Sequence, residues 1–188
     1  MTTIAIAGAT GAVGQQMLEC LKERNIKANL KLLASARSKG KEIDGHIVEE
    51  LTKESFQGVD YVLGATGNDI TKMWMPWAKE AGCIVVDNSS AFRLENDVPL
   101  VIPEVNKEDI KKHHGLIANP NCATIIALVA LHALHKKYHI KRMIVTTFQA
   151  VSGAGVQGIE DLKNQIEDEN IPSKAFPYQI AFNLIPQI

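Results

Sequence analysis

The fold is decided by Thr3-Ile4-Ala5-Ile6-Ala7, which is followed at once by Gly8-Ala9-Thr10-Gly11-Ala12-Val13-Gly14. The first five residues are mostly apolar and rich in β-branched side chains, which predicts a buried strand. The glycines allow a tight turn and close approach of a pyrophosphate, and the helix that follows offers that anion unpaired N–H groups. A dinucleotide site is therefore favoured over a purely structural turn, although the spacing is Gly-x-x-Gly-x-x-Gly rather than Gly-x-Gly-x-x-Gly.

Outward from this turn, apolar runs and helical stretches alternate along the chain. Strands are predicted at Thr3–Ala7, Leu30–Ala36, Tyr61–Ala65, Ile84–Asp87, Leu116–Ala118 and, as the longest, Lys141–Ala150. Helices are predicted at Ala12–Glu23, Lys72–Glu80, Lys107–His113 and Thr124–Lys137. The alternation predicts an α/β fold with a doubly wound, Rossmann-type parallel sheet. We place a domain boundary near residue 125, with a nucleotide-binding domain at 1–125 and the beginning of a second domain at 126–188.

Composition narrows the class of protein. The chain has 188 residues, 46% hydrophobic and 22% charged, with a net charge of −1, which argues against nucleic acid bound through bulk charge. The sequence contains no apolar run of about 18 residues, so we expect no membrane span. We see no basic segment followed by an apolar one at the start, so we expect no secretory signal. The cysteines are odd in number and widely spaced, which favours a reducing cytoplasm over a disulfide framework or a zinc knuckle; they are Cys20, Cys83 and Cys122.

The segment after the second predicted strand indicates the cofactor. An acidic residue there would bind the ribose of NAD, but the segment reads Ala34-Ser35-Ala36-Arg37-Ser38-Lys39-Gly40. Arg37 can hold a 2′-phosphate with two N–H groups, and Ser35 and Ser38 can donate to it. We therefore expect NADP, against the alternative of a solvated basic loop.

Cys122 stands at or near the start of the helix predicted from Thr124, in Asn119-Pro120-Asn121-Cys122-Ala123-Thr124. A helix N-terminus lowers the pKa of a thiol and so favours the nucleophilic thiolate. An inert cysteine more often lies within an apolar run, as Cys83 does beside Ile84. We predict that Cys122 is a nucleophile; the competing interpretation is a small residue at a helix start.

Other polar groups follow predicted strands. The segment Asp87-Asn88-Ser89-Ser90-Ala91-Phe92-Arg93 combines two hydroxyls with a guanidinium, which could hold an anion such as phosphate or form an ordinary polar loop. Gln149 could orient a carbonyl or a water, or only satisfy the backbone. We expect no metal site at three histidines that share a predicted helix face, because no carboxylate or cysteine stands at a suitable spacing; they are His132, His135 and His139.

Taken together, these motifs resemble the aspartate-semialdehyde dehydrogenases over nearly the whole chain. The resemblance is carried in order by Gly8–Gly11, Ala34–Ser38, Asp87–Arg93, Asn119–Cys122 and Gln149–Gly155. The N-acetyl-glutamyl-phosphate reductases have a similar glycine turn, but their cysteine follows Asn-Pro-Gly, so Asn121 favours the aspartyl enzymes. A nucleotide-binding module without turnover is the alternative from a different class.

The resemblance implies NADPH-dependent reductive dephosphorylation of L-aspartyl 4-phosphate to L-aspartate 4-semialdehyde, in the biosynthesis of lysine, methionine, threonine and isoleucine. It implies that Cys122 is the nucleophile, that Gln149 helps to hold the acyl-enzyme, and that Arg93 and Asn121 belong to the phosphate or substrate site. It implies a cofactor site at Gly8, Thr10, Gly11, Ala12, Val13, Gly14, Ser35, Arg37, Ser38, Ser152 and Gly153. It also implies a cytoplasmic homodimer whose second domain is an α+β catalytic and dimerisation domain.

The family pattern extends beyond this chain. Its acid/base histidine, its arginine for the substrate carboxylate and much of its dimerisation domain would lie after residue 188, and the apolar tail Phe176–Ile188 stops in mid-pattern. We therefore expect the chain alone to bind the cofactor without measurable turnover.

Overall fold

The computed structural model describes residues 1–186. Gln187 and Ile188, the end of the apolar tail, lie outside the described residues. Contacts divide the chain into two compact units, Met1–Val145 and Thr146–Ile188, and each is described by itself. The proposed domain boundary near residue 125 stays a prediction. Within the described residues, no helix has the length and apolar character to cross a bilayer.

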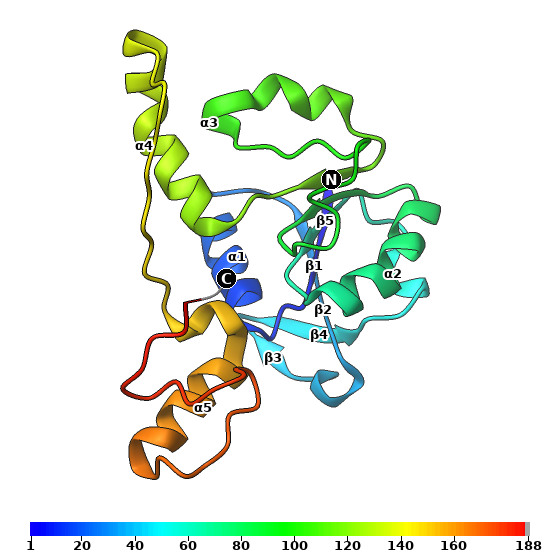
Figure 1. Ribbon diagram of the computed structural model, residues 1–188. Helices are drawn as coiled ribbons and strands as arrows, with labels where there is room; N and C mark the ends of the chain where they lie inside the picture. The colour runs from blue at the N-terminus through cyan, green and yellow to red at the C-terminus, as the bar shows by residue number, and fades with distance from the viewer. Residues whose placement is uncertain (187–188) are drawn as a thin grey trace. The chain divides into compact units, whose positions relative to one another are not determined.

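The first unit is built on one seven-stranded sheet (Figure 1). Its strands, in the spatial order β3-β4-β2-β1-β5-β6-β7, are Glu42–Ile43, His46–Glu50, Asn29–Ala34, Thr3–Ala7, Tyr61–Gly64, Ile84–Asp87 and Leu116–Ala118. Only β3 is antiparallel to its neighbour. The six parallel strands, renumbered along the chain, run 3-2-1-4-5-6, which is the order of a doubly wound dinucleotide-binding sheet. The predicted fold class is confirmed.

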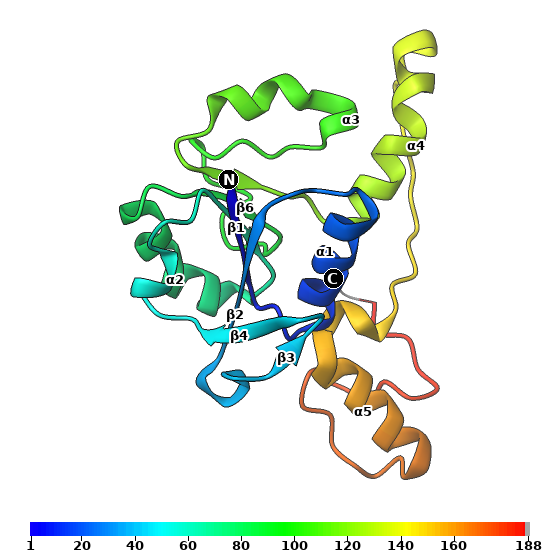
Figure 2. The same ribbon diagram turned by 180° about the vertical axis from the view of Figure 1, so that it is seen from behind.

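Helices α1 (Ala12–Glu23) and α2 (Asn68–Glu80) cover opposite faces of this sheet (Figures 1 and 2). Because side chains alternate along a strand, β1 contributes to both cores. Ile6 packs in the cluster that contains Leu18 of α1, whereas Ala5 and Ala7 pack in the cluster that contains Trp74 of α2. The first strand is therefore fixed between two apolar layers, with its C-terminal end directed into the glycine turn.

The structure describes seven further helices. Short helices are η1 (Ala36–Ser38), η2 (Glu54–Phe56), α3 (Pro103–Asn106), η3 (Lys107–Lys112) and η4 (Val151–Ala154), and longer ones are α4 (Cys122–Tyr138) and α5 (Gly155–Glu167). The helix predicted from Thr124 begins two residues earlier, at Cys122 itself. This places Cys122 in the first turn of α4, the longest helix described.

The predicted strand Lys141–Ala150 is wrong. Residues 141–150 have no regular secondary structure, and the side chains of Ile144 and Phe148 are 81% and 82% exposed. A β-branched run forms a strand only where a neighbouring strand accepts its N–H groups and one face is covered. None of the described strands pairs with this segment.

The hairpin of β3 and β4 was not predicted from the sequence. Its turn is Asp44-Gly45, with φ values of 55° and 75°, which is the conformation that Asp-Gly favours in a two-residue hairpin. The strands beside this turn are short and carry several charged residues, so they show no clear apolar strand pattern. The Asp-Gly dipeptide was the sequence signal that could have predicted the hairpin. The hairpin matters for the fold because β4 supplies the third parallel strand.

In the second unit, two buried side chains of α5 organise the loop that follows it. Asp161 accepts the N–H groups of Lys174 and Ala175 at 2.8 and 2.6 Å. Gln165 accepts the N–H groups of Ile180 and Ala181 at 2.8 and 3.2 Å. The backbone hydrogen bond from Ala175 is the main reason why the pKa of Asp161 lies below its ordinary value.

Candidate active site

The glycine turn lies where the strand order reverses, between β1 and β5. Gly8 has a φ of 93°, and a Cβ there would come 2.6 Å from the carbonyl oxygen of Ala65, which follows β5. A Cβ on Gly14 would overlap the carbonyl oxygen of Gly8. Gly8 is therefore required for the glycine turn to pack against the loop after β5, and Gly14 is required for the same turn to pack against α1. Ligands of doubly wound sheets bind in the crevice at this switch point.

The N-terminus of α1 suits an anion. Its N-cap, Gly11, has no side chain to occupy the first N–H groups, and the first turn carries no acidic residue. Ala12 and Val13 are exposed, so a ligand can approach their backbone. Unpaired N–H groups and the helix dipole both favour a phosphate here. The residues present therefore fit the pyrophosphate of a dinucleotide.

The loop after β2 presents the predicted phosphate ligands differently. The N–H of Ser38 donates to the carbonyl oxygen of Ser35 at 2.8 Å and closes the turn η1. The side chains of Ser35 and Arg37 are exposed, whereas Ser38 is buried. Within residues 1–186, no carboxylate forms an ion pair with Arg37, so its charge is available to an added phosphate.

Cys122 is exposed at the first turn of α4. The preceding residue, Asn121, is the N-cap, and its Oδ1 accepts the N–H of Ala123 at 2.9 Å. No acidic residue occupies the first turn. The thiol therefore lies at the positive end of the helix dipole, with solvent access, which is the environment of a reactive cysteine.

Arg93 lies within a set of hydrogen bonds that joins the ends of β6 and β7. Its Nε donates to the carbonyl oxygen of Asn119 at 2.8 Å, and its Nη2 donates to the carbonyl oxygen of Asn88 at 3.0 Å. Nδ2 of Asn119 donates to Oδ1 of Asn88 at 2.7 Å. These three residues are called the polar ring below. It brings the predicted anion-binding loop next to the loop that carries Cys122.

Sequence reasoning missed Asn88 and Asn119 as individual contributors, and it also missed Asp87. The Asp87 carboxylate is fully buried and accepts the hydroxyl of Ser89 at 2.7 Å and the N–H of Ser89 at 3.0 Å. This Asp-x-Ser turn is a local signal that could have been recognised. The contact between Asn88 and Asn119, in contrast, requires the pairing of β6 with β7.

Three other predicted site residues belong to the second unit. Gln149, Ser152 and Gly153 are exposed around η4. A Cβ on Gly153 would overlap Nε2 of Gln149, so the glycine lets this amide lie close to the turn. Gln149 and Gly153, two of the predicted site residues, therefore lie next to each other.

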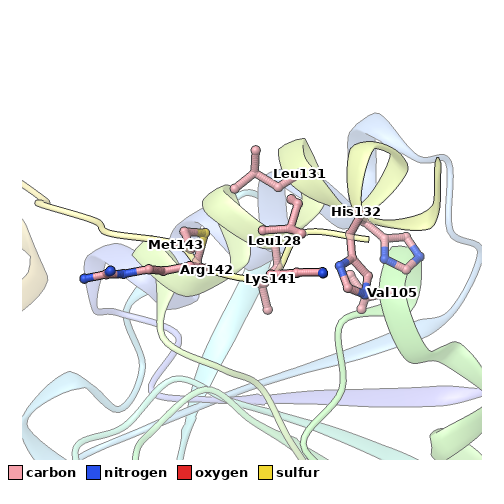
Figure 3. A pocket seen from close by; sticks show the side chains of 9 residues that line it. Val105, Leu128, Leu131, His132, Lys141, Arg142 and Met143 are labelled. Atoms are coloured by element: carbon pink, nitrogen blue, oxygen red, sulfur yellow. The ribbon is translucent and has the colours of Figure 1, made fainter. Parts of the chain in front are cut away.

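The three histidines that share a face of α4 lie at or near its C-terminal end: His132, His135 and His139. His132 and His135 line a cavity of about 290 Å³ with Leu128, Leu131 and Met143 (Figure 3). His135 lies thirteen residues along the helix from Cys122, a distance of roughly 20 Å at about 1.5 Å per residue. The histidines that line this cavity therefore lie well away from the proposed nucleophile. In the described part of the chain, no group of three or more histidine, cysteine or acidic residues could hold a metal.

Comparisons with known proteins agree with this arrangement. The family model described as "Semialdehyde dehydrogenase, NAD binding domain" matches residues 3–113, and "Semialdehyde dehydrogenase, dimerisation domain" matches residues 131–188. The aspartate-semialdehyde dehydrogenase of Aquifex aeolicus is 50% identical over 98% of this chain and 58% of its own length. The chain thus spans little more than half of the curated relatives it matches.

Solved structures show the same relationship. Aspartate-semialdehyde dehydrogenase II of Vibrio cholerae, complexed with ASA, has a TM-score of 0.89 and 45% identity, over all of this chain and 59% of its own. The aspartate-semialdehyde dehydrogenase of Candida albicans, solved with NADP, has a TM-score of 0.62 and 28% identity, over 74% of this chain and 48% of its own. The resemblance inferred from the motifs is confirmed, and the chain belongs to the semialdehyde dehydrogenase family.

Proposed function

We propose that the protein to which this chain belongs reduces L-aspartyl 4-phosphate to L-aspartate 4-semialdehyde with NADPH and releases phosphate. The observation that carries the proposal is the exposed Cys122 at a helix N-terminus, beside a loop in which Arg93 is already fixed. A thiolate and a guanidinium on neighbouring loops match the two needs of an acyl phosphate, a nucleophile and an anion-binding group.

The chain's own residues account for the first chemical step. The thiolate of Cys122 attacks the acyl carbon, a C–S bond forms, and the C–O bond to phosphate breaks. The N–H groups of Arg93 that the polar ring does not use would bind the departing phosphate. NADPH, held by the glycine turn and Arg37, would supply a hydride to the acyl carbon; cleavage of the C–S bond would then release the aldehyde and restore the Cys122 thiolate.

The cofactor choice rests on charge. The exposed Arg37 and Ser35, beside Ser38, favour the extra phosphate of NADP, and the first turn of α1 favours the pyrophosphate. The Candida albicans relative, whose structure was solved with NADP, supports this choice. The remaining cofactor contacts are proposed at the glycine turn, Gly8, Thr10, Gly11, Ala12, Val13 and Gly14, and at Ser152 and Gly153.

The other roles follow from family membership. Gln149 holds the acyl-enzyme, and Asn121 contacts the substrate or phosphate in addition to capping α4. The dimerisation-domain match supports a homodimer, with a nucleotide-binding domain at 1–125 and a catalytic and dimerisation domain that begins at 126. The setting is amino-acid biosynthesis in the cytoplasm, leading to lysine, methionine, threonine and isoleucine.

Experiments on the 188-residue chain can test cofactor binding, thiol modification and turnover separately. It is incubated with NADP, phosphate and aspartate semialdehyde, and NADPH absorbance, cofactor binding and covalent modification of Cys122 are followed. We expect cofactor binding and a mass adduct on Cys122 but no measurable turnover, because the acid/base histidine that the family resemblance implies is not among residues 1–188 and such a group contributes about 10²–10⁴ in rate. N-acetyl-glutamate semialdehyde is the competing substrate, and Cys20→Ser is the matched control for Cys122→Ser. An adduct that persists in Cys122→Ser would contradict the proposal.

A further inference from the structure

We propose that Asn88 is a positioning residue that holds the Arg93 guanidinium and the loop before Cys122 in one arrangement. The inference rests on the proposed function, in which Cys122 attacks and Arg93 binds phosphate. Its basis is the polar ring, in which Asn88 uses its side-chain oxygen for Asn119 and its backbone oxygen for Arg93. Asn119 completes the ring through its own carbonyl oxygen.

Both asparagines are anchored to the sheet. The N–H of Asn88 donates to the carbonyl oxygen of Gly64 at 3.1 Å, and the N–H of Asn119 donates to the carbonyl oxygen of Asp87 at 2.8 Å. These bonds continue the ladders of β5, β6 and β7 past their last paired residues. The polar ring is therefore anchored at the carboxyl ends of parallel strands, where sites of this fold class are built.

The polar ring determines which edge of Arg93 remains for an anion. Nε and Nη2 form one edge of the guanidinium plane, and both donate to backbone carbonyl oxygens. Arginine has five N–H donors in a fixed planar fork, so three remain: both on Nη1 and one on Nη2. An anion can therefore use two donors only at the Nη1–Nη2 end, and Asn88 helps to fix the direction in which that end points.

The polar ring also reaches the nucleophile through a short connection. Only Pro120 and Asn121 separate Asn119 from Cys122. Pro120 is buried and has a fixed φ, and Asn121 is held as the N-cap. A displacement of Asn119 is therefore passed to the first turn of α4. One side chain, Asn88, can in this way set the spacing between thiol and guanidinium.

The test uses Asn88→Ala, Asn119→Ala and the double variant of the whole chain. The first readout is protection of Cys122 by inorganic phosphate against alkylation, followed by peptide mass spectrometry over a range of pH. Each single variant should weaken protection about tenfold, because small displacements of reacting groups have large effects. The double variant should be no worse than either single variant, since the two side chains act as one pair.

The matched control is Asn106→Ala. Asn106 lies in the same unit, and its side chain makes three hydrogen bonds: with Ile102, Leu100 and Asp109. Its removal should lower the melting temperature and leave phosphate protection of Cys122 unchanged. If Asn88 had a purely structural role, Asn88→Ala would likewise lower the melting temperature and leave phosphate protection of Cys122 unchanged.

The second readout does not depend on the proposed function. By NMR, exchange of the Arg93 Nε–H with water should be slow in the wild type and about tenfold faster in Asn88→Ala, because loss of the bond from Asn119 Nδ2 to Asn88 Oδ1 frees the loop whose Asn119 carbonyl oxygen accepts that N–H. If phosphate does not protect Cys122 in the wild type, the proposed function fails. If the Arg93 Nε–H also exchanges at the same rate in Asn88→Ala as in the wild type, the positioning role fails as well. Wild-type protection that survives unchanged in Asn88→Ala, whatever its melting temperature, overturns the positioning role alone.

Discussion

Oδ1 of Asn121 accepts the N–H of Ala123 at 2.9 Å, so that the two residues on either side of Cys122 are tied to each other. The amide proposed for the substrate site thus also starts the helix on which the proposed nucleophile lies. Its Oδ1 is committed to the backbone, and any ligand must use the remaining donors or share that oxygen.

Replacement of this cap should affect both stability and reactivity. Asn121→Ala should lower the free energy of unfolding by about 1 kcal/mol, since an N-cap side chain satisfies one unpaired N–H. It should also slow alkylation of Cys122, because the helix start becomes less well ordered. Chemical denaturation and timed alkylation measure the two effects. Asn121→Ser restores a capping oxygen and should recover most of both, and equal behaviour of the alanine and serine variants would contradict the prediction.

The cofactor preference should depend on Arg37. Arg37→Ala should remove most of the preference for NADP(H) over NAD(H), about 1–3 kcal/mol for a lost charged hydrogen bond. Titration calorimetry with both cofactors measures it. Lys39→Ala is the matched control, because Lys39 is a neighbouring exposed cation that pairs with Glu50 at 3.4 Å. Equal dissociation constants for the two cofactors in the wild type would rule out the assignment.

The three thiols should react in a fixed order. Cys83 is 2% exposed, its thiol donates to the carbonyl oxygen of Val59 at 3.2 Å, and burial raises its pKa. Cys122 is exposed and Cys20 is half-buried. With limiting iodoacetamide, peptide mass spectrometry should find Cys122 labelled first and Cys83 last. Early labelling of Cys83 in folded protein would contradict the structure of the α2 core.

The second unit should loosen in acid. The pKa of Asp161 is lowered in the folded state by the backbone N–H groups of Ala175 and Lys174. A lowered folded pKa means that the carboxylate stabilises the fold above its unfolded pKa, near the ordinary value of 3.8, and that this contribution is lost as pH falls through the folded pKa.

The measurement is the NMR amide shift of Lys174 and Ala175 as a function of pH. Both signals should stay native at neutral pH and move together below the ordinary carboxyl range, as the loop of residues 171–181 loosens. Asp161→Asn should remove this titration and weaken the loop at neutral pH, where the wild-type carboxylate is ionised. Signals that move near neutral pH instead would show that Asp161 is not the group that controls the loop.

Local patterns predicted much of the first unit. The bounds of β1, α1, β6 and β7 agree with the structure, because the strands are apolar runs, the helix is amphipathic, and glycine or polar residues lie near the ends of each. The segment 141–150 has the same β-branched composition and is not a strand. A β-branched composition is compatible with a strand, but the strand forms only where a neighbouring strand pairs with it.

The candidate site was predictable loop by loop but not as an assembly. The motif around Cys122 correctly placed it at a helix start, since Asn121 is a good N-cap. The polar ring was not predictable, because Asn88 and Asn119 are 31 residues apart and meet only through the register of β6 with β7. Hydrogen bonds between loops depend on tertiary geometry, which no motif encodes.

The central place of β1 has a consequence for how the chain folds. Its neighbours, β2 and β5, both come later in the sequence, so one edge stays unpaired until residue 29 and the other until residue 61. Thr3–Ala7 carries no charge and alternates isoleucine with alanine, a composition prone to intermolecular strand addition. Until both partner strands have been synthesised, this stretch exposes unpaired N–H and C=O groups to strands of other chains.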